Sequence, residues 1–500
     1  MTGAESRTLN RTIAAAPVAS FAFVAMLALA AVAVRNGLVA DDTLRLWAGA
    51  GTAADGQVPI GRIVAGYPTL PFLATTLVAW LAPAGTPAPA LVAAGIFSLI
   101  AAFCFLSFRR IGLPLAVAAT FLIAFHPALV RAVIAGPADM LFAAFLLMFS
   151  LGLYDLRVRS GTSEVMHVGL ALMALAFAHP VGAAFAFAAV PFLAFAVRPL
   201  LVASSALNVV IALIFPAVFM LVSFAYVSWV FPGAGWSFFA APAQSLSLWT
   251  AAAARLFGDG LFHVPAIDAS LAMGAALAVG APAAVTMLAL AYRRRPLVIP
   301  GVVFLVTAIA ATVICVASGF FGEPTAIVVA APVLAATVVI RIPIARERFR
   351  TTTVLLVLGW FGGFLSLALV DPITVNRLHA AFDPAAGERL DTIAAGGAFA
   401  ERDGVLADTE NAPALVIGRG RAHGILGPES EAFALAMLFA RVDTPLIAVP
   451  DPQSPAGVND RLDKAFPSLF REGLAGYRVI YQNNTWRLFA KQNDVEISKQ

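Results

Sequence analysis

Residues 109–159 read RRIGLPLAVAATFLIAFHPALVRAVIAGPADMLFAAFLLMFSLGLYDLRVR and contain two long apolar runs, near 112–129 and 138–154. Each run approaches the roughly 20 residues that an α-helix needs to cross a bilayer. Arginines lie at both outer ends of the segment, whereas Arg131 and Asp139 lie near the short stretch between the two runs. This pattern predicts two antiparallel transmembrane helices.

The composition of the whole chain agrees with this local pattern. The 500 residues are 61% hydrophobic and only 12% charged, with a mean hydropathy of +0.89. Soluble proteins carry about 25% charged residues, so we predict a polytopic membrane protein. The net charge of +4 is spread over the loops, which excludes nucleic acid as a partner. Cys104 and Cys315 lie in separate apolar runs and predict neither a disulfide framework nor a zinc site.

Eleven apolar runs predict eleven transmembrane helices. The first is too long for the core of a cleaved signal peptide and is interpreted as a signal anchor. The predicted spans lie near 14–34, 88–107, 112–129, 138–154, 165–179, 181–197, 203–230, 266–291, 297–320, 325–340 and 352–370. A further apolar segment, 68–83, is too short for a span and is interpreted as a helix in or dipping into the outer interface.

The distribution of arginine predicts the orientation, because short cytoplasmic loops are enriched in Lys and Arg. Alternate loops hold fourteen arginines on one side and five on the other. The N-terminus is therefore predicted in the cytoplasm and the C-terminus outside. The five outer arginines are Arg35, Arg45, Arg62, Arg131 and Arg255.

Two domains are predicted: a transmembrane domain over residues 1–370, with an outer loop at 36–87, and a soluble α/β domain over 371–500. The second region holds 17 of the 28 acidic residues and all three lysines. Its short apolar runs predict strands within 404–409, 412–418, 444–452 and 476–490, the last a hairpin centred on Asn483 and Asn484. Helices are predicted within 430–442 and 459–466.

The predicted spans carry no Asp, Glu, Lys or Arg at their centres. Ion-coupled transporters usually need such groups, so their absence disfavours an ion-coupled transporter. The charged residues at the outer face are the better candidates for a functional site. Asp41 and Asp42 open the segment DDTLRLWAGAG directly after the first span. Asp41 is either an N-cap that pairs with Arg45 or a general base that takes a proton from an acceptor hydroxyl.

The next outer loop presents Arg131 and Asp139. Asp139 either caps a helix or is a second acid of an outer-face site that includes Asp41. Arg131 suits a lipid phosphate, because a guanidinium holds phosphate through parallel hydrogen bonds, although a head-group anchor accounts for it equally well. His126 and His179 each precede proline and are interpreted as markers of helix ends.

Two further segments allow two interpretations each. The third outer loop, 232–268, contains Trp236, Trp249, Arg255 and His263; it is either an aromatic belt at the interface or a lid that stacks on a sugar or prenyl tail. GRGRAHG, residues 418–424, is either an exposed loop or a cradle for an anion.

VADDTLRLWA (residues 39–48), GYPTLPFLATTLVAWLAP (66–83) and the segment 109–159 together resemble the GT-C membrane glycosyltransferases. This superfamily includes protein O-mannosyltransferases and the bacterial enzymes that put aminoarabinose on lipid A. The resemblance covers roughly residues 14–200. It matches Asp41 to the catalytic acid of the first outer loop, Asp42 to the acid that follows it, and Asp139 to the acid of the second loop. The chain departs from the aminoarabinose branch at Gly66 and Tyr67, where that branch has charged residues.

The resemblance implies a GT-C-like fold, a sugar donor on a polyprenyl phosphate, and a glycan, lipid or protein acceptor. Asp41 would deprotonate the acceptor hydroxyl, and attack at the anomeric carbon would expel polyprenyl phosphate with inversion. Metal use is left open, since some members of the superfamily use a divalent ion such as Mg or Mn; Asp41, Asp42 and Asp139 would be its ligands. The candidate substrate-binding residues are Asp42, Asp139, Arg131, Arg62, Tyr67, Arg255 and His263.

Alanine-rich spans and an excess of Arg over Lys indicate a bacterial protein of the cytoplasmic membrane, with its C-terminal domain in the periplasm. A different class of function stays open: a lipid or glycan transporter, or a non-catalytic subunit in the assembly of an envelope polysaccharide.

Overall fold

A computed structural model describes residues 3–36, 38–56, 60–63, 67–83, 85–159, 161–230, 264–292, 295–342, 349–371 and 388–492. By their internal contacts these residues form two compact units. The helical unit comprises Met1–Ala30, Ala65–Pro71 and Val92–Arg377, and the sheet unit comprises Ala31–Val64, Phe72–Leu91 and Leu378–Gln500.

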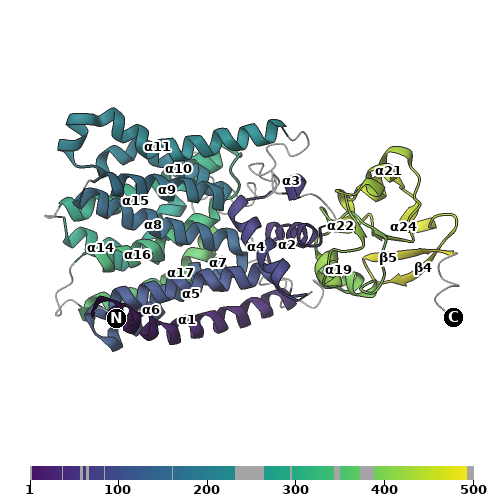
Figure 1. Cartoon of the computed structure of the whole chain (residues 1–500), viewed down its shortest axis with the longest axis horizontal. Coiled ribbons are helices and arrows are strands. Elements are labelled where there is room, and N and C mark those ends of the chain that lie inside the picture. The colour runs from purple at the N-terminus through teal and green to yellow at the C-terminus, as the bar shows by residue number, and fades with distance from the viewer. Residues whose placement is uncertain are drawn as a thin grey trace. The chain divides into compact units, whose positions relative to one another are not determined.

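Helices make up most of the described part of residues 3–371 (Figure 1). They are α1 (Gly3–Arg35), α2 (Asp41–Ala54), α3 (Ile60–Ile63), α4 (Thr69–Leu81), α5 (Ala88–Phe108), η2 (Arg109–Ile111), α6 (Leu113–Ala124), α7 (Pro127–Ala135), α8 (Pro137–Val158), α9 (Thr162–Ala178), α10 (Pro180–Ala196), α11 (Pro199–Val230), α13 (Pro265–Gly280), α14 (Pro282–Leu290), α15 (Arg295–Ser318), η3 (Pro324–Val329), α16 (Ala330–Arg341) and α17 (Phe349–Val370).

The predicted spans correspond to these helices. Among the described residues, six helical segments are long and apolar enough to cross a membrane: those of α1, α5, α8, α15, α17 and the continuous η3–α16. Two bent pairs, α6 with α7 and α13 with α14, pass together and turn by 52° and 84° at their breaks. The other three predicted spans fall on α9, α10 and α11, whose described apolar stretches are shorter. The short segment 68–83 forms the 13-residue helix α4.

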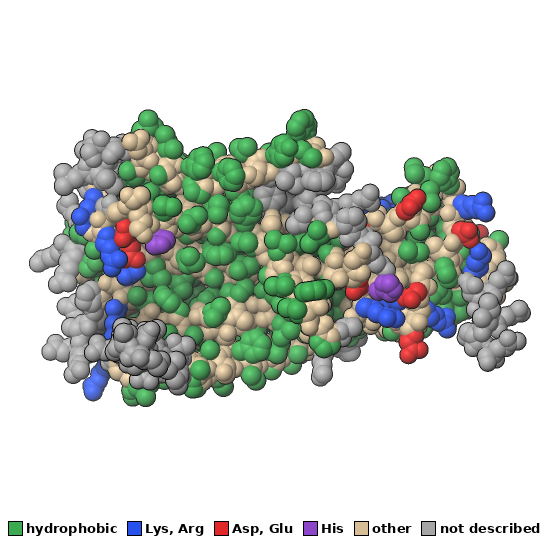
Figure 2. Space-filling model, viewed as in Figure 1, with side chains coloured by type: hydrophobic (Ala, Val, Ile, Leu, Met, Phe, Trp, Pro, Cys, Tyr) green, Lys and Arg blue, Asp and Glu red, His purple; other side chains and the backbone are tan. Residues whose placement is uncertain are grey.

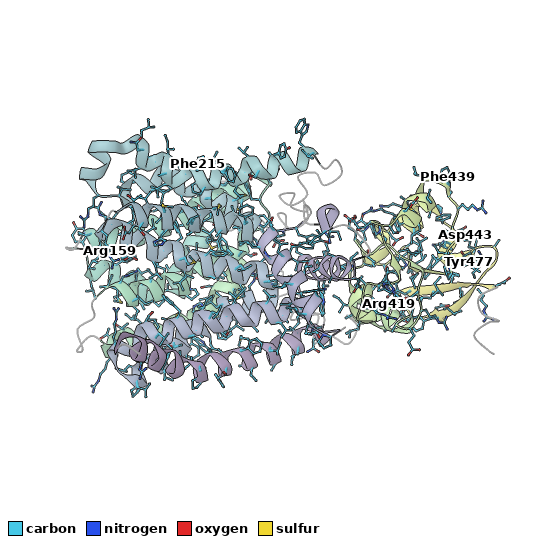
Figure 3. All side chains as sticks on the ribbon, viewed as in Figure 1. Arg159, Phe215, Arg419, Phe439, Asp443 and Tyr477 are labelled. Atoms are coloured by element: carbon cyan, nitrogen blue, oxygen red, sulfur yellow. The ribbon has the colours of Figure 1, made fainter. Side chains whose placement is uncertain are left out.

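Small residues allow the helices of the helical unit to approach closely. A Cβ added to Gly362 of α17 would lie 2.1 Å from the carbonyl oxygen of Val279 in α13, and one added to Gly182 of α10 would lie 1.9 Å from the carbonyl oxygen of Leu175 in α9. Backbone approach at small residues is a common mode of helix packing in membranes. Hydrophobic side chains cover much of the face of the helical unit seen in Figure 2, and Phe215 of α11 points outward from the unit (Figure 3).

His126 joins three helices of this unit. It is the N-cap of α7, and its Nδ1 accepts a hydrogen bond from the backbone N–H of Ala128. Its Nε2 then carries the proton and lies 3.1 Å from the carbonyl oxygens of both Gly280 and Gly359. The prediction that His126 marks a helix end is confirmed.

The C-terminal part contains a five-stranded sheet in the order β2-β1-β3-β5-β4. Strands β1 (Val405–Leu406), β2 (Ile425–Leu426) and β3 (Leu446–Pro450) are parallel, whereas β4 (Tyr477–Gln482) and β5 (Trp486–Lys491) form an antiparallel hairpin next to β3. The helices are α19 (Glu388–Ala398), α20 (Ala414–Arg419), α21 (Glu431–Phe439), α22 (Pro455–Val458), α23 (Arg461–Ala465) and α24 (Leu469–Glu472).

Alternating side chains of β3 build a core on each face of the sheet, as strand geometry requires. Leu446 and Ala448 join one buried cluster with Trp486, whereas Ile447 and Val449 join another with Phe489. The predicted α/β domain with a terminal hairpin is present. One prediction is wrong: 412–418 is not a strand but contains most of α20, the crossover helix between the parallel strands β1 and β2.

The division of the chain into these two units differs from the predicted domain boundary at residue 370. Residues 31–64 and 72–91 of the predicted outer loop group by contact with the C-terminal residues. The boundary itself stays a prediction.

Candidate functional site

A cluster of charged side chains gathers where several helices of the helical unit begin or end. Arg131 is in α7, Asp139 is in the first turn of α8, and Asp371 directly follows α17. His179 lies at the junction of α9 and α10, and Thr325 is in the first turn of η3. We call these five residues the Arg131 cluster.

Gly136 makes the geometry of the α7–α8 turn possible. It has φ 128° and ψ −168°, a conformation that favours glycine, and it ends α7 while it caps α8. Pro137 follows at the first position of α8, where its missing N–H costs nothing. The sharp turn allows Arg131 and Asp139, eight residues apart, to face each other and pair.

Arg131 is the centre of the cluster. Its Nε donates to Oδ2 of Asp371 at 2.7 Å, its Nη1 pairs with Oδ2 of Asp139, and its Nη2 donates to Oγ1 of Thr325 at 3.2 Å. The side chains of Asp139 and Asp371 are 11% and 1% exposed, respectively. Because burial makes an unpaired carboxylate costly, the guanidinium is what allows both acids to remain charged.

His179 binds the other oxygen of the Asp139 carboxylate. Its Nδ1 accepts a hydrogen bond from the backbone N–H of Val181, 3.1 Å away, and so caps α10. The proton of the neutral ring therefore lies on Nε2, which is 3.3 Å from Oδ1 of Asp139. The prediction that His179 marks a helix end is confirmed, but this residue also positions an acid.

The net charge of the Arg131 cluster argues against the expectation that Arg131 binds a lipid phosphate. One guanidinium lies between two carboxylates, and the neighbouring His179 is neutral by its hydrogen bonding. The cluster thus has a net negative charge, which favours hydroxyl or amine groups as ligands over a bare phosphate. Asp139 does not have the capping role that was its alternative, because its two oxygens face Arg131 and His179.

The opposite end of the helical unit is rich in arginine (Figure 2). There Arg110 donates to the carbonyl oxygen of Ile340 at the end of α16, and Arg157 donates to the carbonyl oxygen of Val197 after α10. Arg341 pairs with Asp155. Basic groups are favourable at helix C-termini, and this is the end predicted to face the cytoplasm.

Asp41 and Asp42 belong to the sheet unit, where they form the first two residues of α2. Ala40 occupies the N-cap position, so Asp41 is not the N-cap that one interpretation expected. Both acidic side chains are exposed, and their charge is favourable in the first turn of a helix.

The other predicted site residues have different outcomes. Tyr67 is partly buried and lies before α4. Arg62 lies in α3, but its side chain is outside the described residues, as are Arg255 and His263 entirely. The third outer loop, 232–268, which was interpreted as either an aromatic belt or a lid, lies almost wholly outside the described residues.

The GRGRAHG segment, residues 418–424, contains a buried arginine that the exposed-loop interpretation did not predict. Arg419 is buried and donates to Asp403 at 2.7 Å and to the carbonyl oxygen of Arg402 at 2.6 Å. The neighbouring guanidinium holds the pKa of the Asp403 carboxyl below its usual range. Figure 3 shows Arg419 within the C-terminal domain.

Sequence reasoning also missed Asp371 and Thr325. A signal for Asp371 was present in the sequence. This residue directly follows the predicted span 352–370, at the end that the predicted topology places on the same side of the membrane as Asp139.

No family model and no curated protein sequence matches the chain. A solved structure does: the crystal structure of ArnT from Cupriavidus metallidurans bound to undecaprenyl phosphate. The match covers 93% of this chain and 97% of that chain, with a TM-score of 0.53 and 13% sequence identity. The chain has the fold of ArnT. The predicted GT-C-like fold is thus confirmed over nearly the whole length, beyond residues 14–200 where the sequence resemblance was noted.

Proposed function

We propose that this protein is a glycosyltransferase of the bacterial cytoplasmic membrane that transfers a sugar from a polyprenyl-phosphate donor to a glycan, lipid or protein acceptor. The observation that carries the proposal is the near full-length likeness to ArnT, whose structure holds undecaprenyl phosphate. A lipid-linked donor also accounts for a transferase with most of its chain in the bilayer, because the prenyl tail stays in lipid while its phosphate lies at head-group depth.

Asp41 is the proposed general base. Its carboxylate takes the proton of the acceptor hydroxyl, the acceptor oxygen bonds to the anomeric carbon, and the bond from that carbon to the phosphate oxygen breaks. Polyprenyl phosphate leaves, and the configuration inverts in this single step. The exposed position of Asp41 at the start of α2 is compatible with access to an acceptor.

The Arg131 cluster is the proposed binding site for the polar part of a substrate. Asp139, held by Arg131 and His179, would accept hydrogen bonds from sugar hydroxyl or amine groups. In this proposal the main role of Arg131 is to hold Asp139, and its part in phosphate binding is smaller than the sequence alone suggests. Of the other candidate substrate-binding residues, we propose Arg62 and Arg255 as partners of the departing phosphate, and Asp42, Tyr67 and His263 as sugar contacts.

A divalent ion is the remaining open component. Within the residues that the structure describes, no group of three or more His, Cys, Asp or Glu side chains could hold a metal ion. Asp139 is engaged by a guanidinium and an imidazole, so a cation there would compete with Arg131. The surroundings of Asp139 therefore do not fit Mg or Mn, and the proposed step is written without a metal.

The test is transfer of radiolabelled sugar from a panel of polyprenyl-phosphate donors by purified protein in lipid nanodiscs. Wild type is compared with Asp41→Asn and with the control Asp443→Asn, whose exposed side chain pairs with Lys491. We expect transfer by wild type and the control, and a loss of at least a hundredfold in Asp41→Asn. Equal transfer by Asp41→Asn would remove Asp41 as the base. Absence of transfer from every donor by folded protein would favour a transporter or a non-catalytic assembly subunit.

A further inference from the structure

Helix α2 is built into the core of the C-terminal domain. Ala48 belongs to the same buried cluster as Leu415, Ala422 and Trp486. The ideal Cβ position of Gly51, one turn further along α2, is 3.8 Å from the Cβ atom of Ala422. The helix that begins with Asp41 is therefore packed, through its second half, against residues nearly four hundred positions later in the sequence.

Two polar contacts fix the same interface. The Oδ2 atom of Asp55, the residue that ends α2, accepts a hydrogen bond from the backbone N–H of His423 at 2.6 Å. The backbone N–H of Gly85 donates to the carbonyl oxygen of Gly420, also at 2.6 Å. Both contacts are made by the GRGRAHG segment. They attach the predicted outer loop to the C-terminal domain at two points, one before and one after α4.

Gly420 is suited to this close approach. Its φ is +80°, where a side chain is strained. A Cβ added there would lie 3.5 Å from the Cα atom of Gly85, an ordinary van der Waals distance, so the backbone conformation and not the space is what favours glycine. Gly420 thus serves a backbone-to-backbone contact inside the protein. This accounts for the motif without an anion.

We infer that α2 and the C-terminal domain form one rigid body through which this domain positions Asp41, with Asp55 as the positioning residue. The inference rests on the proposed function, in which Asp41 is the base. Helix α2 has 14 residues and is thus about 20 Å long. A tilt of about 3° at the Asp55 end moves Asp41 by about 1 Å, and a displacement of this size can lower a catalysed rate by about a hundredfold.

A disulfide tests whether the two parts remain together during turnover. The Cβ separation of 3.8 Å between positions 51 and 422 equals the mean of native disulfides. Gly51→Cys/Ala422→Cys is made in a background in which the buried Cys104 and Cys315 are replaced by alanine. Disulfide formation is measured by counting free thiols in the denatured protein, with the two single-cysteine variants as controls.

We expect the double variant to oxidise completely under a mild oxidant, and its oxidised form to transfer sugar within twofold of its reduced form. Failure to oxidise in the native protein would overturn the rigid body. So would a rate that falls more than tenfold on oxidation and returns on reduction, because α2 would then have to separate from the domain during turnover.

Variants of Asp55 test positioning. Asp55→Ala removes the acceptor for the His423 N–H and is expected to lower kcat about tenfold with KM for the donor unchanged, whereas Asp55→Asn retains an acceptor oxygen and most of the rate. The Gly51–Ala422 disulfide should restore the rate of Asp55→Ala, which a catalytic or merely stabilising role of Asp55 does not predict. The control is Asp443→Ala.

The outcomes separate the two proposals. Wild-type kcat in Asp55→Ala, or no rescue by the disulfide, would overturn the role of Asp55. Disulfide formation does not depend on activity, so it reports on the rigid body even if Asp41→Asn remains active and the proposed base is wrong.

Discussion

The Nε2 atom of His179 lies 3.3 Å from Oδ1 of Asp139, on the carboxylate whose other oxygen pairs with Arg131. The same imidazole caps α10 through Nδ1, so both ring nitrogens are engaged and the neutral tautomer is determined by the backbone. A single histidine thereby couples the α9–α10 junction to the first turn of α8, and holds Asp139 in one orientation.

Substitution of His179 separates its two roles. His179→Asn keeps a side-chain oxygen for the Val181 N–H but is too short to hold Asp139, whereas His179→Ala loses both contacts. Loss of a cap costs about 1 kcal/mol, so only the alanine variant should unfold at a clearly lower temperature. Both variants should lower sugar transfer about tenfold. If the asparagine variant keeps full activity, the contact with Asp139 has no part in transfer.

Arg131 cannot be replaced by another cation. In Arg131→Lys, one ammonium replaces a planar group that contacts Asp139, Asp371 and Thr325 together. The ammonium keeps the charge but cannot reach all three partners, so at least one buried acceptor loses its hydrogen bond, at a cost of about 1–3 kcal/mol. We expect a lower melting temperature and transfer reduced at least a hundredfold. Arg159→Lys is the control, because Arg159 is exposed and lies 3.9 Å from Glu164. Similar melting temperatures of the two variants would contradict a structural role for the cluster.

Gly362 is predicted to be indispensable for the packing of α17 on α13. In Gly362→Ala the new methyl group would lie 2.1 Å from the carbonyl oxygen of Val279, so the helices must separate. Overpacking of this kind costs about 1–3 kcal/mol. Gly95→Ala in α5 meets nothing within 4 Å and should be neutral or stabilising, since alanine favours helix. Thermal unfolding of the two variants in nanodiscs compares them directly; equal midpoints would contradict the close packing.

The spans were predictable from the sequence because each apolar run is long and flanked by arginine or proline. The α6–α7 break carried a signal, because His126 before Pro127 was interpreted as a helix end, but the α13–α14 break did not, because Ala281-Pro282 lies in ordinary apolar sequence. APALVIG (residues 412–418) was misassigned because a short apolar run fits a strand or a buried helix equally well. The helix signals were Pro413 and Gly420, which flank α20.

The candidate site was predictable only in part. Asp139 and Arg131 were identified as outer-face charges, but their partners Asp371 and His179 are 232 and 40 residues from Asp139 in the sequence. Contacts at such separations depend on how helices pack and leave no local pattern. The same holds for the contact between Asp55 and His423, which unites two regions that composition assigned to different domains.

The last prediction concerns Asp460, which caps α23 and is fully buried. Burial raises the pKa of this carboxyl to about 7, and the nearby carboxylate of Asp408 acts in the same direction. The folded protein therefore keeps a proton that the unfolded chain loses near pH 4. This contribution to stability is fully present below pH 4 and is lost as the pH rises through 7.

The C-terminal domain should thus unfold at a lower temperature at pH 8 than at pH 5.5, with a difference in unfolding free energy on the order of 2 kcal/mol. Asp460→Asn can still cap α23 but does not ionise, so its unfolding temperature should vary little over this range. Asp443→Asn should keep the wild-type dependence, because the ion pair with Lys491 holds the pKa of Asp443 below its ordinary value, far from this range. The measurement is the unfolding midpoint of the full chain in nanodiscs, followed by tryptophan fluorescence. An unchanged pH dependence in Asp460→Asn would assign the effect to another group.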